Sequence, residues 1–260
     1  MVTDVLVRAA RLALGAATDL IWPRSCAGCA EESPVFDPGF AELLCEPCAA
    51  TVTTCKSLPS CPRCAAPQPE PAASSPAHSC RDCRRLSPAL ASIAAAYLYD
   101  GALPQVVQQL KWQHRDDLAR PLGRLLTPLL RQHLSQVDVI IPVPLHPRRL
   151  RARGYNQSTL LLRAALSGLP RPHPPILHNA LLRQHDTDPT RAHSPAARQA
   201  QVAAAFTLKK SAAKALAGRR VLLIDDVVTT GATVSACATT LTAANVQATY
   251  ALALLRTPSP

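Results

Sequence analysis

The chain has 260 residues, of which 48% are hydrophobic and only 3% aromatic, and it contains 25 Pro, 10 Cys and 9 Gly. Its many Ala, Leu and Val residues exclude a disordered chain, and the small number of Gly excludes a collagen-like repeat. The net charge of +11 favours an anionic partner, which is a nucleic acid, a membrane surface or a phosphorylated small molecule.

Residues 1–25 are expected to form an N-terminal amphipathic helix. Its apolar side chains fall roughly on one side of a helix: Val5, Leu6, Leu12 and Leu20. A secretory signal is not expected, because Asp4, Arg8 and Arg11 interrupt the apolar residues. The helix either packs on the protein or lies on a membrane surface. No run of 18 apolar residues occurs, so we expect no membrane insertion and a cytoplasmic protein.

The next segment, 26–90, contains an internal repeat of cysteines. Eight of them form four Cys-x-x-Cys pairs: Cys26/Cys29, Cys45/Cys48, Cys61/Cys64 and Cys80/Cys83. In each half, 15 residues separate the two pairs, and the first half maps onto the second by an offset of 35. This spacing is typical of zinc ribbons, so the segment is predicted to be a double zinc ribbon.

The chemistry of the repeat favours two structural Zn²⁺ ions. Two residues between thiolates allow one turn to present both sulfurs to one ion, and four thiolates leave no open position for catalysis. The alternatives are disulfides or buried thiols, which are less compatible with a chain without a secretory signal. Ligation can be sequential or cross-braced, and the repeat favours sequential pairing. Cys55 is expected to be a spare thiol and Cys237 a core residue.

The positive charge is confined to the second part of the chain. Residues 1–90 carry 8 basic and 9 acidic side chains, whereas residues 91–260 carry 20 basic and 8 acidic ones. Eight zinc-bound thiolates would make the first part more negative still, which suits a phosphate backbone poorly. Of the 28 basic residues, 23 are Arg, a side chain that binds phosphate oxygens in pairs.

Residues 91–260 are predicted to form one α/β domain. Strands are expected at 93–99, 137–141, 221–224 and 250–255, and helices at 103–112, 160–166 and 232–244. A further helical stretch at 115–134 is expected to be broken by Pro121 and Pro128. Strands that alternate with helices indicate a parallel sheet that binds ligands at the carboxyl ends of its strands.

The segment 221–233 carries the main candidate site. An apolar strand leads to Asp225 and Asp226, and a loop of small residues then opens a helix: Thr229, Thr230, Gly231, Ala232 and Thr233. Loop amides and Thr hydroxyls suit a phosphate, and two carboxylates suit the vicinal hydroxyls of a sugar. Together they indicate a ribose 5-phosphate; the alternative is an ordinary helix cap.

This segment resembles the motif that binds 5-phosphoribosyl 1-pyrophosphate (PRPP) in type I phosphoribosyltransferases. The resemblance implies that Asp225 and Asp226 contact the ribose hydroxyls and that Thr229–Thr233 hold the 5-phosphate. It also implies a parallel-sheet type I phosphoribosyltransferase fold. Some purine-salvage relatives have an Asp base where this chain has Thr229, so the resemblance does not imply that the chain salvages 6-oxopurines.

A second segment, 141–157, extends the resemblance to the ComF family. That family joins a double zinc ribbon to a phosphoribosyltransferase-like domain and is linked to DNA uptake by competent bacteria. Residues 110–112 and 204–206 also fit the family. Four Arg lie within 148–153 after a predicted strand, and this basic loop suits pyrophosphate or a nucleic-acid backbone; the alternative is a solvated loop.

Two functions from different classes follow. In the first, Mg²⁺-PRPP binds and a nucleophile displaces pyrophosphate, with Lys111, Arg148 and Arg149 stabilising the leaving group. We identify no catalytic base. In the second, a non-catalytic accessory protein uses the same pocket and basic loop, including Arg153, on single-stranded DNA, with DNA-processing or competence proteins as partners. A PRPP sensor without turnover is a third possibility.

Overall fold

The structure is a computed structural model that describes residues 24–32, 35–40, 43–68, 80, 82–185 and 204–258. The predicted N-terminal helix lies almost entirely outside the described residues. Among the described residues, no helix has both the length and the apolar character needed to cross a bilayer.

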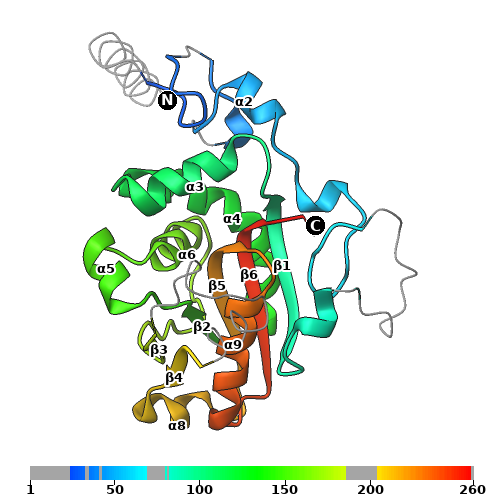
Figure 1. Ribbon diagram of the computed structural model, residues 1–260, viewed down its shortest axis with the longest axis vertical. Coiled ribbons are helices and arrows are strands. Elements are labelled where there is room, and N and C mark those ends of the chain that lie inside the picture. Colours follow the sequence, from blue (N-terminus) through cyan, green and yellow to red (C-terminus); the bar gives the residue numbers. More distant parts are fainter. Residues whose placement is uncertain are drawn as a thin grey trace, which may run out of the picture.

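A parallel four-stranded sheet forms the centre of the protein (Figure 1). Its order is β1 (Leu90–Leu98), β6 (Ala248–Arg256), β5 (Arg220–Val228) and β2 (Val139–Pro142). This confirms the predicted α/β fold with a parallel sheet. The carboxyl ends of β5 and β6 are level, because Val228 pairs with Arg256.

Helices cover both faces of the sheet. α3 (Leu103–Trp112), α4 (Ala119–His133) and α6 (Gln157–Ser167) share one core with Leu222 and Ile224 of β5. α9 (Ala232–Leu241) shares the other core with Val221 and Leu223. Successive strand residues point to opposite faces, so a strand covered on both sides must be apolar throughout, as β5 is before Asp225.

The remaining elements are short. They are the helices α2 (Glu46–Ala50), α5 (Pro147–Arg153) and α8 (Ala213–Leu216), with the antiparallel pair β3 (Leu181–Arg183) and β4 (Phe206–Leu208). Single 3-10 turns lie at Pro38–Phe40, Cys55–Ser57, Asp82–Arg85, Asp116–Leu118, Leu134–Gln136, Lys210–Ala212 and Thr242–Ala244.

The predicted break of the helical stretch 115–134 is wrong, because α4 continues through both prolines. Pro121 lies in the first turn of α4, where an N–H has no partner within the helix. Pro128 is exposed and removes only the hydrogen bond to the carbonyl of Arg124, which is also on the solvent side. Burial of four Leu on the opposite side outweighs this loss: Leu122, Leu125, Leu126 and Leu130.

The basic segment 148–153 is helix α5 and not a loop. His146 caps its start by accepting a hydrogen bond from the amide of Arg148, and Pro147 occupies its first position. Gly154 ends it with a φ of 85° in the left-handed region. The arginines of this segment therefore have the fixed directions of helical side chains.

The cysteine-rich segment covers the free edge of the sheet, which is strand β1. Thr54 forms an antiparallel bridge with Tyr97, and the amide of Leu98 donates to the carbonyl of Thr53 at 2.9 Å. Further along the strand, the amide of Ile93 donates to the carbonyl of Arg63 at 2.7 Å. The segment thereby pairs polar backbone groups that an edge strand would otherwise expose.

Candidate functional site

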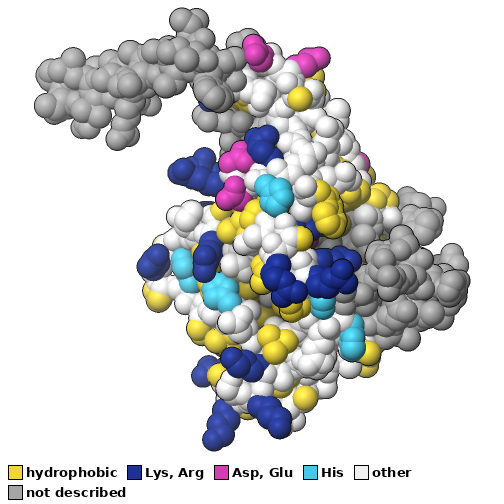
Figure 2. Space-filling model, turned by 60° about the vertical axis from the view of Figure 1, so that its left-hand side comes forward, with side chains coloured by type: hydrophobic (Ala, Val, Ile, Leu, Met, Phe, Trp, Pro, Cys, Tyr) yellow, Lys and Arg dark blue, Asp and Glu magenta, His cyan; other side chains and the backbone are white. Residues whose placement is uncertain are grey.

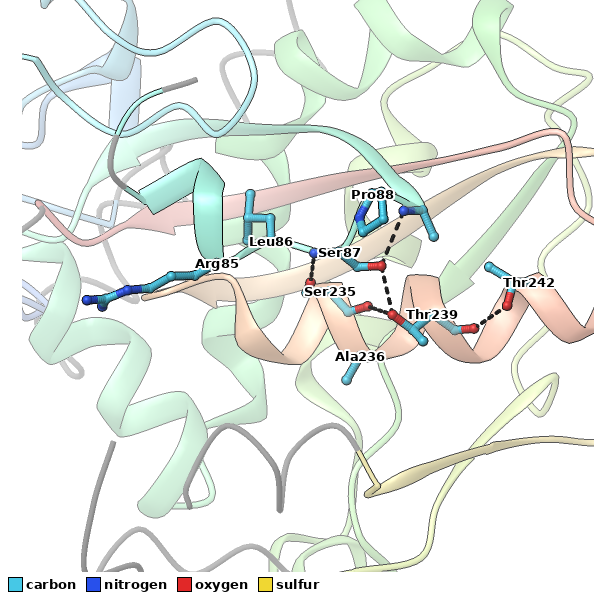
Figure 3. A pocket seen from close by; sticks show the side chains of 9 residues that line it. Arg85, Leu86, Ser87, Pro88, Ser235, Ala236, Thr239 and Thr242 are labelled. Atoms are coloured by element: carbon cyan, nitrogen blue, oxygen red, sulfur yellow. Dashed lines mark hydrogen bonds between the residues drawn. The ribbon is translucent and has the colours of Figure 1, made fainter. Parts of the chain in front are cut away.

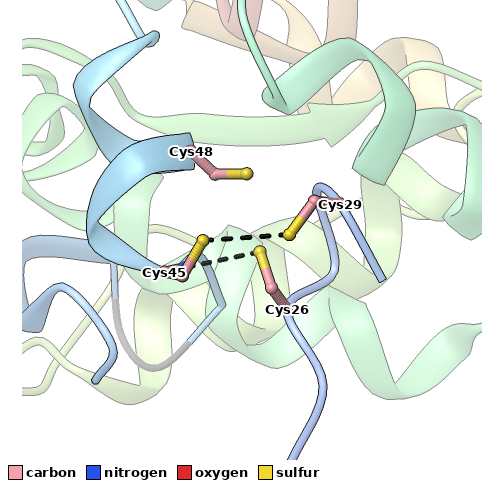
Figure 4. Close-up of side chains that lie close together, drawn as sticks. All are labelled: Cys26, Cys29, Cys45 and Cys48. Carbon is pink, nitrogen blue, oxygen red and sulfur yellow. Dashed lines mark hydrogen bonds between the residues drawn. The ribbon is translucent and has the colours of Figure 1, made fainter. Parts of the chain in front are cut away.

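The first cysteine cluster joins the two Cys-x-x-Cys pairs of the first repeat. Cys26 and Cys29 come from a turn, Cys45 and Cys48 from the start of α2, and Figure 4 shows their sulfurs facing a common centre. The four sulfurs lie within 4.8 Å of one another, with Cys29 Sγ 3.9 Å from Cys45 Sγ. Four sulfurs bound to one zinc at 2.3 Å lie about 3.8 Å apart, so the cluster fits a zinc ion.

The second cluster has the same composition. It consists of Cys61, Cys64, Cys80 and Cys83, also within 4.8 Å of one another. The Sγ–Sγ distances are 3.5 Å for Cys61–Cys83, 3.4 Å for Cys64–Cys80 and 3.6 Å for Cys80–Cys83. Ligands are therefore paired sequentially along the chain, as the repeat favours. Cys55 and Cys237 are buried and belong to neither cluster.

Backbone amides prepare one thiol in each cluster for metal binding. Burial raises the pKa of the Cys26 thiol, but backbone N–H groups, that of Cys45 first, outweigh it and lower this pKa to about 6. In the second cluster, amides led by that of Cys64 likewise overcome burial and lower the pKa of Cys61 to about 7. Thiolate is the form that binds metal, so Cys26 and Cys61 already favour their ligand state, whereas burial raises the pKa of Cys48 and Cys64, which metal binding would have to offset.

The two carboxylates of the candidate ligand site lie at the carboxyl end of β5. Asp225 Oδ1 accepts a hydrogen bond from Ser158 Oγ at 3.3 Å and from the amide of Asp226 at 2.9 Å. Asp226 Oδ1 accepts from Gln157 Nε2 at 3.3 Å, and its Oδ2 lies 2.5 Å from Lys111 Nζ. Three elements, α3, α6 and β5, thus converge on this pair.

The environment separates the charge states of these two buried carboxyls. Burial, with the adjacent charge of Asp226, raises the pKa of Asp225 to about 8. Burial acts on Asp226 too, but the ammonium of Lys111 outweighs it and lowers the pKa of Asp226 below its ordinary value. Of the two, Asp226 is therefore the carboxyl that favours the ionised form, and Asp225 is the one that holds a proton more readily than an ordinary carboxyl.

The loop after β5 offers hydrogen-bond donors toward the same end of the sheet. Thr229 and Thr230 are exposed, and Gly231 has a φ of 77° in the left-handed region before α9 begins. Within the described part of the chain, the amides of Thr230 and Gly231 donate to no protein acceptor. Unpaired amides and hydroxyls next to a helix N-terminus can bind an anion.

The structure places the predicted cationic residues in different environments. Lys111 pairs with Asp226, and Arg148 is exposed on α5. Arg153 is buried; its Nη1 donates to Gln157 Oε1 at 2.5 Å, and its guanidinium lies 4.8 Å from the ring centre of Trp112. Arg153 therefore contacts Asp226 indirectly, through Gln157.

Sequence reasoning gave no role to Ser158, Gln157 or Arg256. The first two open α6, which Asn156 caps by accepting from the amide of Ser158 at 2.9 Å. Asn156 also donates to the carbonyl of Val143 at 2.9 Å, which fixes this helix start beside the end of β2. The sequence did contain a signal for the first two. They are polar residues directly after an Asn that can cap a helix, in a domain that is expected to bind ligands at the ends of its strands.

The surface beside α5 is rich in positive charge. On this side of the molecule, Figure 2 shows Lys and Arg side chains from the upper to the lower part, whereas Asp and Glu appear only in the upper part, next to some of the Lys and Arg. Trp112, which packs against Arg153 of α5, is 65% exposed, which is uncommon for so large an apolar side chain.

Comparison with known proteins places the chain among bacterial relatives, although no family model matches it. It is 31% identical over 222 residues to the DNA utilization protein YhgH of Escherichia coli, covering 82% of this chain and 90% of that protein. It is 33% identical over 164 residues to competence protein F of Haemophilus influenzae, covering 61% and 70%. The chain belongs to the ComF family. The 222 residues matched exceed the length of segment 91–260, so the likeness to this ComF-family relative extends into the cysteine-rich segment.

Proposed function

We propose that the chain is a PRPP-binding, phosphoribosyltransferase-like protein that acts in DNA uptake or DNA utilisation. The observation that carries the proposal is the buried pair Asp225 and Asp226 at the carboxyl end of β5, followed by a loop in which the amides of Thr230 and Gly231 donate to no acceptor among the described residues. Ionised Asp226 can accept hydrogen bonds from ribose hydroxyls, and Asp225 can do so once its proton leaves. Thr229–Thr233 supply donors for the 5-phosphate.

The pyrophosphate group would lie toward the cationic residues. Lys111 already pairs with Asp226, and helix α5, which follows strand β2, carries Arg148 and Arg149. Bound Mg²⁺ would neutralise charge on the pyrophosphate oxygens, and carboxylates are ligands that it accepts. In a transfer reaction an acceptor's lone pair forms a bond to C1 while pyrophosphate leaves with the C1–O electrons. The residues of the site position and neutralise these groups.

Calorimetry with PRPP in Mg²⁺ tests the proposal. We expect binding by the wild-type protein and none by Asp225→Asn/Asp226→Asn. Asp138→Asn is the matched control, because Asp138 pairs with Arg220 near the amino ends of β2 and β5. Equal affinity in the double variant and the wild type would remove the ribose assignment. Ribose 5-phosphate and pyrophosphate as competitors locate the two ends of the ligand.

A specific observation favours single-stranded DNA as a second ligand, consistent with the names of the relatives. Trp112 exposes one part of its ring while Arg153 packs against it, and α5 presents Arg148 and Arg151 nearby. An exposed aromatic ring beside cationic side chains suits an unpaired base and its phosphate. This second role would use the surface, and PRPP would use the carboxylate pair.

A further inference from the structure

Arg256 connects the second cysteine cluster with the loop of the candidate phosphate site. It ends β6, is 1% exposed, and donates from Nε to the carbonyl of Cys64 at 3.1 Å. Its Nη1 donates to the carbonyl of Thr229, and to those of Val228 at 3.4 Å and Thr257 at 3.0 Å. One buried guanidinium thus holds a metal-ligand residue and the loop at the same time.

These bonds determine where the loop amides point. In a planar trans peptide the carbonyl and the following N–H point in opposite directions. Because the carbonyls of Val228 and Thr229 face Arg256, the N–H groups of Thr229 and Thr230 point away from it, and that of Thr230 has no protein acceptor among the described residues. Arg256 therefore directs the donors that an incoming phosphate requires.

The second cluster also supports the loop by packing. Leu86 follows Cys83 by three residues and lies against Gly231, where an added Cβ would come within 2.7 Å of Leu86 Cδ2. The next residue, Ser87, forms two hydrogen bonds with α9. Its amide donates to Ser235 Oγ at 2.5 Å, and its hydroxyl accepts from Thr239 Oγ1 at 2.8 Å (Figure 3). The exit from the second cluster is thus attached to the first turns of α9.

The first cluster makes a different connection. The carbonyl of Ala27, between Cys26 and Cys29, accepts a hydrogen bond from Gln109 Nε2 at 2.7 Å. Gln109 lies on α3, two residues before Lys111. The first cluster therefore supports the helix that carries Lys111, and the second supports the phosphate loop.

We propose that Arg256 is a positioning residue that makes the affinity for a phosphate-bearing ligand depend on metal in the second cluster. Metal fixes Cys64, Cys64 fixes the guanidinium, and the guanidinium orients the loop amides. The identity of the ligand as PRPP rests on the proposed function. The coupling between the second cluster and the loop does not.

A double-mutant cycle tests the coupling. Arg256→Met, Cys80→Ser and the combined variant are titrated with PRPP, after metal analysis and melting curves show that each is folded. We expect each single variant to lose about tenfold in affinity, and the combined variant to lose no more than either alone, because both break one connection. Effects that simply add would overturn the proposal.

A ligand-free readout separates this proposal from the proposed function. The amide of Ser235 donates to the carbonyl of Gly231 at 2.9 Å, so its hydrogen exchange reports on the loop end. Exchange should accelerate in Arg256→Met with both clusters still loaded, be partly rescued in Arg256→Lys, and remain at the wild-type rate in the first-cluster variant Cys48→Ser. Unchanged exchange in loaded Arg256→Met refutes the positioning role. If exchange responds but the wild type does not bind PRPP, the positioning role holds and only the assigned ligand is wrong.

Discussion

Lys111 Nζ lies 2.5 Å from Asp226 Oδ2, although 114 residues separate the two in the sequence. The contact arises because the end of α3 lies over the carboxyl end of β5. It keeps Asp226 ionised in a buried place, and it occupies an oxygen that a ligand would also use. Lys111 therefore both prepares the carboxylate and competes with the ligand for it.

Removal of the Lys111 charge should destabilise the protein more at high pH than at low pH. In Lys111→Met, the pKa of Asp226 rises because the ammonium that lowers it is gone. The buried carboxyl can then take up a proton at pH 5, whereas at pH 9 it stays charged without a partner. We expect a loss of about 3 kcal/mol in the free energy of unfolding at pH 9, and a smaller loss at pH 5. Urea unfolding at both pH values measures this. Lys111→Arg keeps the charge, and an equal loss at both pH values in Lys111→Met would contradict the explanation.

Protonation of Asp225 should make stability fall as the pH rises. Its pKa is near 3.8 in the unfolded chain and about 8 in the fold, so only the folded state holds the proton between these values. The resulting stabilisation of the folded state is complete below pH 4. It decreases progressively as the pH rises, and it is lost once the pH has passed 8. Asp225→Asn imitates the protonated form and keeps an Oδ1 for Ser158. Its melting temperature should fall less than that of the wild type between pH 5 and pH 9; parallel curves would refute the shift.

The sequence predicts features that depend on near neighbours. The cysteine clusters follow from a spacing of two and fifteen residues, and α3 begins and ends at the predicted residues because its apolar positions recur with helical period. The contacts of Lys111 and Arg256 depend instead on the strand order β1-β6-β5-β2, which no local pattern specifies. Arg256 could have been noticed as a charge that ends an apolar strand beside β5. Arg153 could not, since its burial depends on Trp112 and Gln157 from two other elements.

A side chain at Gly231 should disturb the loop more than strain alone explains. Gly231 and Gly218 both have a positive φ, but only at Gly231 would a Cβ meet neighbours, 2.7 Å from Leu86 and 3.2 Å from Ile93. Gly218→Ala should cost about 1 kcal/mol from the backbone alone. Gly231→Ala should cost about 3 kcal/mol, including overpacking, and weaken PRPP binding. Leu86→Ala should restore part of this loss; equal costs at the two glycines would contradict the packing argument.

The clusters should contain about two zinc ions per chain and contribute to stability. Metal analysis of the purified protein should show this content, falling to about one in Cys45→Ser and in Cys83→Ser. Cys55→Ser should retain both ions, because Cys55 belongs to neither cluster. Chelation should lower the melting temperature of the wild type. Full metal content in Cys83→Ser, or intact disulfides in the wild type, would refute the sequential ligand sets.

Binding of single-stranded DNA, if it uses α5, should depend on salt through the arginines of that helix. Loss of two phosphate contacts in Arg148→Ala/Arg151→Ala should reduce the slope of log affinity against log salt by about 1.4, at 0.7 per phosphate. Lys209→Ala/Lys210→Ala removes the same charge from exposed positions before α8 and should change the slope less. Fluorescence anisotropy with labelled oligothymidylate measures the slopes.

Trp112 distinguishes base stacking from charge alone at this surface. Trp112→Ala should weaken oligothymidylate binding by about 1–3 kcal/mol at every salt concentration and leave the slope unchanged, because stacking releases no counterions. Equal slopes in the α5 and Lys209/Lys210 variants, with unchanged binding in Trp112→Ala, would exclude this surface as the DNA site.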